Sequence, residues 1–255
     1  MSHVSIQPTP TALVTGASYG IGRAIALGLA QDGWDVVVTD LDTHTLASVV
    51  DGIQALGRRA VALPLDLRRP AEFSDFIAAL GQQCPGLSAL INNAGVPSLS
   101  KPAVNTTLAD WESVVDTNLK GTYFMTLAFG QWLISRARTG SIISLSSTHG
   151  SVGFPGASVY GMAKAGINQM TRMLAIEWAP QGIRLNAIAP GTTPTETRQA
   201  SLSQPARREA MLARIPLNRF GTVEEMAAAA RYLASPQASY ITGQILHLDG
   251  GLTAY

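Results

Sequence analysis

The sequence is poor in cysteine, in charged residues and in long apolar runs, and each scarcity excludes a class of protein. Cys84 is the single cysteine, so no intrachain disulfide can form, which fits a reducing compartment without requiring one. Charged residues make up 14% of the chain, a low fraction for a soluble protein, so we expect other subunits to cover part of its surface. No apolar run approaches the ~18 residues of a membrane-spanning helix, and no membrane partner is predicted.

The charge pattern excludes further classes. The formal net charge is +1 and no run of basic residues, Arg207–Arg208 among them, is longer than two, so nucleic acid is not an expected partner. The four histidines lie far apart in the sequence, and no metal site is predicted. The first ten residues, MSHVSIQPTP, lack the basic region and apolar run of a secretory signal. Together these features predict a cytoplasmic enzyme.

Short β-branched runs alternate with longer helical stretches along the chain. We predict seven strands, over residues 11–16, 35–40, 59–67, 88–95, 140–147, 182–191 and 243–251. Continuous apolar strands separated by helical segments are typical of a parallel sheet covered on both faces. The sequence therefore predicts an α/β protein with one doubly wound, Rossmann-type domain over residues 11–255 and a flexible leader over residues 1–10.

One connection is longer than the rest. Residues 192–220 lie between a predicted strand and a predicted helix, and long connections at such places are often lids. The helix that follows has a capping box at its start, with Thr222 as N-cap and Glu225 three residues later.

A glycine-rich loop, TGASYGIG (15–22), follows the first predicted strand. Its glycines, Gly16, Gly20 and Gly22, would let the backbone approach a pyrophosphate at the start of a helix, where amides and the helix dipole favour negative charge. A tight structural turn is the alternative interpretation, because this spacing differs from the common G-x-G-x-x-G fingerprint.

Asp40 ends the second predicted strand, eighteen residues after Gly22. A carboxylate there can accept hydrogen bonds from both ribose hydroxyls of an adenosine and would repel a 2′-phosphate. Neither Tyr19 nor Leu41 supplies a compensating base, and Arg23 is the nearest cation, so we predict NAD(H) rather than NADP(H). Taken alone, Asp40 could equally be a turn or capping aspartate.

A tyrosine stands four residues before a lysine in SVYGMAK (158–164). On a helix these two positions share one face, so the Lys164 ammonium can lie beside the Tyr160 phenol. A free phenol stays protonated at neutral pH, and a nearby positive charge favours its ionised form. The pair could then exchange a proton with a substrate alcohol.

These segments together resemble the short-chain dehydrogenase/reductase family from about Thr11 to Gly251. The family's markers stand in order: TGASYGIG, Asp66 in LDL, NNAG (92–95), Asn118 in VDTNLKG, SLSS ending at Ser147, YGMAK, APG (189–191) and LDGG (248–251). The resemblance implies an NAD(P)-dependent enzyme, and it also implies a homotetramer built from pairs of helices.

The resemblance implies a catalytic set of Asn118, Ser147, Tyr160 and Lys164. Ser147, thirteen residues before Tyr160, would hold the substrate oxygen near the phenol, and Ser146 is the alternative serine. Lys164 would also hold the nicotinamide ribose. The family assigns Asn118 to a water chain that carries the proton away, although alone it could be a structural asparagine.

The resemblance also implies the cofactor contacts. They are Gly16, Ser18, Tyr19, Gly20, Ile21, Gly22, Asp40, Leu41, Asp66, Leu67, Asn93, Ala94, Gly95, Tyr160, Lys164, Pro190, Gly191, Thr193 and Thr195.

The predicted reaction is reversible oxidation of a secondary alcohol to a ketone by hydride transfer to NAD. The region STHGSVGFPGASVYG resembles family members that act on sugars, polyols or 2-keto-3-deoxy sugar acids. One alternative is an NADP-dependent 3-oxoacyl thioester reductase, and another is an NAD-binding regulator without useful turnover.

Four residues are predicted to contact the substrate: Ser147, His149, Tyr160 and Arg198. For His149, a loop histidine facing solvent is the alternative interpretation. The arginines of the predicted lid could bind an anionic substrate or form the solvated face of a helix; they are Arg198, Arg207, Arg208 and Arg214.

Overall fold

The computed structural model describes residues 8–196 and 203–254. Its centre is a seven-stranded sheet in the order β3-β2-β1-β4-β5-β6-β7, in which every neighbouring pair is parallel. The strands are β1 (Thr11–Thr15), β2 (Asp35–Asp40), β3 (Ala60–Pro64), β4 (Leu87–Asn92), β5 (Gly140–Leu145), β6 (Ile183–Pro190) and β7 (Ile245–Leu248). The strand order reverses between β1 and β4, and ligands bind at the carboxyl ends of strands beside such a switch.

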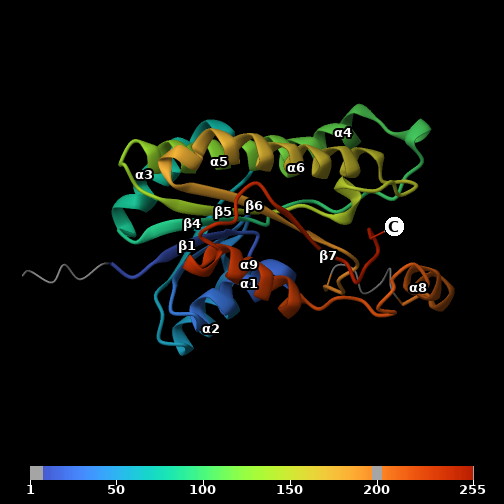
Figure 1. The fold of residues 1–255 in the computed structure, drawn as a ribbon, viewed down its shortest axis with the longest axis horizontal. Helices are drawn as coiled ribbons and strands as arrows, with labels where there is room; N and C mark the ends of the chain where they lie inside the picture. Colours follow the sequence, from blue (N-terminus) through green and yellow to red (C-terminus); the bar gives the residue numbers. More distant parts are fainter. Residues whose placement is uncertain (1–7, 197–202, 255) are drawn as a thin grey trace, which may run out of the picture.

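Helices cover both faces of the sheet (Figure 1). One layer contains α1 (Gly20–Gln31), α2 (Ala47–Ala55) and α9 (Val223–Ala234). The other contains α3 (Phe73–Gln83), α4 (Leu108–Val115), α5 (Thr122–Ile134) and α6 (Ser158–Trp178). The short helix α8 (Pro205–Leu212) projects beyond the layers, near the C-terminal end of the chain. The predicted doubly wound α/β fold is confirmed.

The central strands are mostly apolar because both of their faces are buried. Leu13 and Val37 pack into the core beneath α3, α5 and α6, whereas Val14 and Val38 pack into the core beneath α1, α2 and α9. Successive side chains of a strand point to opposite faces, so a strand between two helical layers needs apolar residues on both of its faces.

Several predicted strands extend too far at their carboxyl ends. The strand predicted over residues 59–67 ends at Pro64, so Asp66 and Leu67 lie in the connection that follows. Likewise β5 ends at Leu145, two residues before Ser147. The apolar pattern continues past the ends of the strands because these connections are partly buried at the edge of the cores. Their backbones, however, no longer form hydrogen bonds with the neighbouring strands of the sheet. The residues that turn away there are the candidate site residues.

The predicted leader and lid are only partly covered by the described residues. Of the leader, residues 8–10 are described, and of the segment 192–220, residues 192–196 and 203–220 are described. Arg198 therefore lies outside the described residues. The capping box of α9 is confirmed: Thr222 N–H donates to Glu225 Oε2 at 2.8 Å, and Glu225 N–H donates to Thr222 Oγ1 at 3.2 Å. Within the described residues, no helix is both long and apolar enough to cross a membrane.

Candidate active site

A cleft of about 450 Å³ opens at the carboxyl ends of the central strands. The glycine loop after β1 lies along one side, and segments after β4, β5 and β6 complete the wall together with Tyr160 and Lys164 of α6. All the predicted cofactor contacts line this cleft except Ser18. Residues spread over 180 positions of sequence are brought together because parallel strands present the same ends to one edge of the sheet.

The glycine loop leaves no room for side chains. Gly16 has φ +63°, and a Cβ there would lie 2.7 Å from the Cα of Ala94. At Gly22, a Cβ would lie 2.3 Å from Asn93 Nδ2 and equally near the carbonyl of Gly16. The loop therefore packs directly on the turn after β4, and its backbone meets the start of α1. Amides at a helix start favour a phosphate group.

Thr15 and Asn93 fix these two turns to each other. The Thr15 hydroxyl accepts hydrogen bonds from the backbone N–H groups of Asn93 and Ala94, each at 3.0 Å. In return, Asn93 Nδ2 donates to the carbonyls of Thr15 and Gly16, at 3.0 and 2.7 Å. Asn93 thus contributes to the cradle by holding the glycine loop. Thr15 was not among the predicted site residues.

Asp40 stands at the far end of the cleft. Its carboxylate accepts a hydrogen bond from Ser18 Oγ at 2.5 Å and one from the backbone N–H of Leu41 at 2.8 Å. The Ser18 hydroxyl is therefore directed at Asp40, which explains why this predicted cofactor contact does not line the cleft. These two hydrogen bonds fix the orientation of the Asp40 carboxylate.

Arg68 lies in the same region and was missed in the sequence. It lines the cleft and forms an ion pair with Asp66, with Nη2 to Oδ2 at 2.7 Å. Hydrogen bonds from the Arg68 side chain hold the pKa of the Asp66 carboxyl below its ordinary value, against a smaller opposing effect of burial. The sequence signal for Arg68 is its place in LDLRR, two residues after Asp66.

The cleft has the features that a nicotinamide dinucleotide requires. Its floor is side-chain-free backbone at Gly16 and Gly22, and its rim carries a carboxylate at Asp40. The hydroxyl of Thr193, buried in the wall, has no hydrogen-bond partner within the described part of the chain. A buried hydroxyl without a partner costs free energy, which a polar ligand group would recover. The residues present therefore fit this class of cofactor.

Tyr160 and Lys164 lie one turn apart on α6, with Lys164 Nζ 5.6 Å from the centroid of the Tyr160 ring. The lysine is buried, and its ammonium donates to the carbonyl of Leu145 at 2.6 Å. Among the described residues, no carboxylate lies within ion-pair distance of it. A buried ammonium without a carboxylate partner places a positive potential beside the phenol.

The two serines at the end of β5 have separate environments. Ser146 Oγ donates to Asn168 Oδ1 at 2.5 Å and is buried against α6. Both serines line the cofactor cleft, and Ser147 also lines a second pocket beside it. Its hydroxyl lies 3.2 Å from His149 Nδ1. This geometry favours Ser147 over Ser146 as the serine that meets a substrate.

Asn118 lies in a π-helical turn, Asp116–Gly121, between α4 and α5. Its side chain is buried and forms two hydrogen bonds with Val96, accepting from the backbone N–H at 2.7 Å and donating to the carbonyl at 2.8 Å. Asn118 does not line the cleft. The side chain therefore anchors the loop after β4, and π-helical turns frequently occur at functional sites.

His149 faces the site rather than solvent. Its ring stacks on Phe154 with centroids 4.1 Å apart and meets the edge of Tyr160 at 5.5 Å. Together with Ser147, His149 lines the second pocket, of about 460 Å³. The structure thus brings Ser147, His149 and Tyr160 together, and Arg198 lies outside the described residues.

Comparison with known proteins places this geometry in a family. Residues 16–253 match the family described as enoyl-(acyl carrier protein) reductase. The 3-oxoacyl-[acyl-carrier-protein] reductase FabG of Staphylococcus aureus is 40% identical over 246 residues, which cover 96% of this chain and 98% of the relative.

Two solved structures are also similar. One, from Agrobacterium tumefaciens, is named provisionally as a 2-deoxy-D-gluconate 3-dehydrogenase and contains bound NADP. It is 38% identical to this chain and has a TM-score of 0.90. The match covers 96% of this chain and 97% of that one. The other, from Beutenbergia cavernae, is named provisionally as an NAD(P)-dependent gluconate 5-dehydrogenase and contains NADP at low occupancy. It is 34% identical to this chain and has a TM-score of 0.91. The match covers 96% of this chain and 97% of that one.

The matches over nearly the whole chain indicate the same family as three features of the structure. These features are the order of the strands, the glycine loop and the Tyr160/Lys164 pair. The chain belongs to the short-chain dehydrogenase/reductase family of nicotinamide-dependent oxidoreductases.

Proposed function

We propose that the protein reversibly oxidises a secondary alcohol to a ketone, with a small sugar, polyol or 2-keto-3-deoxy sugar acid as substrate. The observation that carries this proposal is the convergence of Ser147, Tyr160 and Lys164 on one cleft beside the glycine loop. When bound there, a nicotinamide dinucleotide would accept the hydride from the alcohol carbon or return it to the ketone.

The side chains of this chain would manage the proton and the orientation of the substrate. Tyr160 is the proposed general base for oxidation and general acid for reduction. Lys164, held by the Leu145 carbonyl at 2.6 Å, stabilises the phenolate. The Ser147 hydroxyl would donate to the substrate oxygen, and His149 at 3.2 Å holds that hydroxyl in place. Asn118 would act through the loop it anchors at Val96.

We propose that NAD(H) is the preferred cofactor. Asp40 is the support for this preference, because its carboxylate lines the cleft and is oriented by hydrogen bonds from Ser18 and from the Leu41 N–H. A negative charge there would repel the 2′-phosphate of NADP(H). The two solved relatives bind NADP, and Arg68 lines the same region of this cleft, so cofactor preference is the first property to measure.

A second candidate is reduction of 3-oxoacyl thioesters with NADPH. The similarity to FabG favours it, at 40% identity over nearly the whole chain. The relatives named as gluconate dehydrogenases favour the sugar-acid proposal. A third candidate, an NAD-binding regulator without useful turnover, is disfavoured by the intact arrangement of Ser147, Tyr160 and Lys164.

One experiment separates these candidates. Purified protein is assayed for NADH or NADPH formation with sugars, polyols, sugar acids and 3-hydroxyacyl thioesters, with the Tyr160→Phe protein as control. Turnover of a carbohydrate that is lost in the control supports the proposed function. Turnover of thioesters alone supports the second candidate. Tight NADH binding without turnover of any compound would support the regulator.

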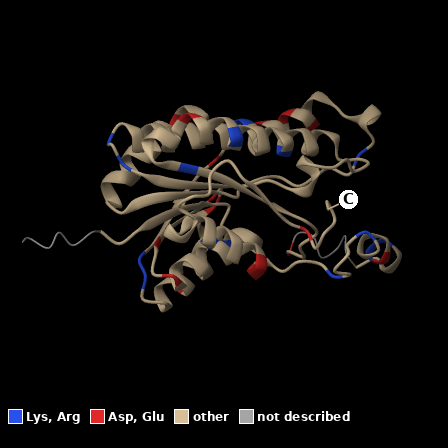
Figure 2. Ribbon diagram, in the orientation of Figure 1, with Lys and Arg blue, Asp and Glu red and all other residues tan. Residues whose placement is uncertain are grey.

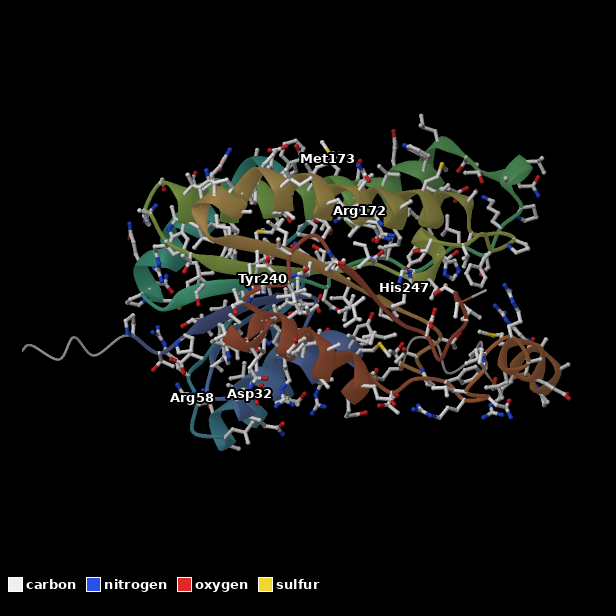
Figure 3. All side chains as sticks on the ribbon, viewed as in Figure 1. Asp32, Arg58, Arg172, Met173, Tyr240 and His247 are labelled. Atoms are coloured by element: carbon white, nitrogen blue, oxygen red, sulfur yellow. The ribbon has the colours of Figure 1, made fainter. Side chains whose placement is uncertain are left out.

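We further propose a cytoplasmic homotetramer. Apolar side chains are exposed on the outer surface of α4, α5 and α6, among them Trp111, Phe124, Met173 and Ile176. Figure 3 shows Met173 on the side of α6 that faces away from the sheet. Tyr240, also labelled there, is a fully exposed side chain on another part of the molecule. An apolar surface that spans three neighbouring helices suits an interface between subunits. Light scattering at micromolar concentration should give about four times the chain mass of 26.8 kDa; a monomer would contradict the proposal.

A further inference from the structure

One face of α6 supports the segment of chain that follows β5, residues 146–151, which we call the serine loop. A Cβ on Gly161 of the helix would lie 3.1 Å from the His149 carbonyl oxygen. A Cβ on Gly150 of the loop would lie 2.8 Å from the carbonyl of Lys164. Gly161 and Lys164 are three residues apart and share one face of the helix. The serine loop therefore packs directly on the helix face that carries the proposed catalytic lysine.

Asn168 lies one turn further along this face and contacts the serine loop near both of its ends. Its Oδ1 accepts a hydrogen bond from Ser146 Oγ at 2.5 Å, and its Nδ2 donates to the Gly150 carbonyl at 3.1 Å. Because a backbone carbonyl can only accept, Gly150 fixes which end of the amide faces it. Ser146 and Asn168 are both buried. One amide thus spans the loop, with Ser147 and His149 between its two contacts.

Neutral groups make these contacts. The serine loop, SSTHGS, contains no aspartate, glutamate, lysine or arginine. Blue segments on α6 in Figure 2 mark its basic residues, of which Lys164 is the buried one, and its ammonium donates to the Leu145 carbonyl instead. A further contact, between Ser151 Oγ and His247 Nε2 at 2.8 Å, is exposed to water. Removing one partner of a buried hydrogen bond leaves the other unsatisfied, so the buried Asn168 contacts are the costly ones to lose.

The way in which the loop lies on α6 bears on the reaction. Ser147 belongs to the loop and Tyr160 belongs to the helix, and the proposed mechanism requires both hydroxyls to contact one substrate oxygen. Displacement of such a group by ~1 Å can lower a rate by about 10²-fold. A side chain that joins the loop to the helix therefore influences the rate without contacting the substrate.

We propose that Asn168 is a positioning residue, which holds the serine loop on α6 and so keeps the Ser147 hydroxyl in reach of the substrate oxygen at Tyr160. This proposal rests on the proposed function. Asn168 lines neither the cofactor cleft nor the second pocket. Its removal should therefore slow the chemical step and leave the affinity for the cofactor unchanged.

The test compares Asn168→Ala with Thr171→Ala. Thr171 is the matched control, because it is buried on the same helix and its hydroxyl donates to the Ile167 carbonyl at 2.8 Å, within α6. Both variants lose a buried polar side chain, so both are assayed well below their unfolding temperatures. We expect Asn168→Ala to lower kcat about 10- to 100-fold, with the Kd for NADH within about twofold of wild type. Thr171→Ala should leave both constants within about twofold.

Hydrogen exchange tests the contact between loop and helix without any turnover. The backbone N–H groups of Gly150, Ser151 and Val152 donate to carbonyls within the loop at 2.9 or 3.0 Å, so their exchange rates report its local opening. We expect these amides to exchange at least about tenfold faster in Asn168→Ala than in the wild-type protein, and at the wild-type rate in Thr171→Ala. If no compound is turned over but this difference is found, the proposed function fails and the role of Asn168 in holding the loop stands.

Ser146→Ala provides a second variant in case Asn168→Ala does not fold, because it removes the same hydrogen bond from the other side and loses a single oxygen. It should also speed exchange in the serine loop. In the double variant, the loss of kcat should not exceed that of Asn168→Ala, because the two side chains share one hydrogen bond.

Three results would overturn the positioning role of Asn168. The first is an unchanged exchange rate of the loop amides in Asn168→Ala. The second is an equal fall of kcat in Thr171→Ala, which would assign the effect to a general loss of stability. The third is weaker binding of NADH by Asn168→Ala with kcat unchanged, which would assign the residue to the cofactor site.

Discussion

The cofactor preference can be tested by removing one charge at Asp40. Asp40→Asn keeps the size of the side chain and keeps an oxygen that can accept from the Leu41 N–H, now at 2.8 Å. It removes the negative charge that would face a 2′-phosphate. The change therefore isolates electrostatic repulsion from shape.

The magnitude follows from Coulomb's law and from the environment of the carboxylate. Two unit charges ~4 Å apart interact by ~4 kcal/mol at an effective dielectric constant of ~20 and by ~1 kcal/mol in water. Asp40 is half-buried, so its environment lies between these limits. We expect a repulsion of about 2–3 kcal/mol, which corresponds to roughly 30- to 150-fold in efficiency with NADP. The efficiency with NAD should fall by about fivefold, since a neutral amide binds the ribose hydroxyls less strongly than a carboxylate.

The assay measures kcat/KM with NAD and with NADP at fixed ionic strength for the wild-type protein, Asp40→Asn and Asp42→Asn. Asp42 is the matched control, because it is exposed and its carboxylate accepts from the His44 N–H at 2.9 Å at the start of a short 3₁₀ helix. Asparagine caps a helix about as well as aspartate. The reasoning is refuted if Asp40→Asn changes the NAD-to-NADP ratio by less than about threefold, or if Asp42→Asn changes it equally.

Two further predictions concern the proposed catalytic groups. Tyr160→Phe should lower kcat by about 10²- to 10⁴-fold, the usual value of a positioned acid or base, while the Kd for NADH changes little; a kcat within tenfold of wild type would assign proton transfer to another group. Asn118→Ala should lower the free energy of unfolding by about 1–3 kcal/mol, because the Val96 N–H and carbonyl both lose their partner. Asn118→Asp keeps the oxygen that accepts from the Val96 N–H but loses the donor to the Val96 carbonyl. Its free energy of unfolding, measured by urea denaturation, should lie between those of the wild-type protein and Asn118→Ala. Equal stability of all three proteins would contradict an anchoring role.

Much of the fold could be predicted from local patterns. A strand buried on both faces is rich in apolar residues on both of them, so the sequence alone predicts the runs at β1, β2, β4 and β5. The Thr222/Glu225 capping box marks the start of α9 by residue type and spacing alone. The i and i+4 spacing of Tyr160 and Lys164 requires only a helix, and α6 supplies it. These features depend on neighbours within a few residues of each other.

The partners of polar side chains could not be predicted in the same way. Asn118 bonds Val96 across 22 residues of sequence, and Ser18 bonds Asp40 across the same interval. A hydrogen bond requires an approach of about 3 Å and a suitable angle, and strand order together with loop conformation sets both. A local pattern does not show that geometry, which is why the hydrogen bond between Ser18 and Asp40 was not predicted and Arg68 was missed.

The sequence by itself determined the alternation of buried strands and helices, the glycine loop and the presence of a tyrosine and a lysine on one helical face, because each follows from the chemistry of neighbouring residues. Only the tertiary structure decided that the Ser146 hydroxyl bonds Asn168 while Ser147 also lines the second pocket, and that His149, Phe154 and Arg214 stack in one series. Phe154 and Arg214 are 60 residues apart, and packing of the connection after β6 against the loop after β5 brings them into contact.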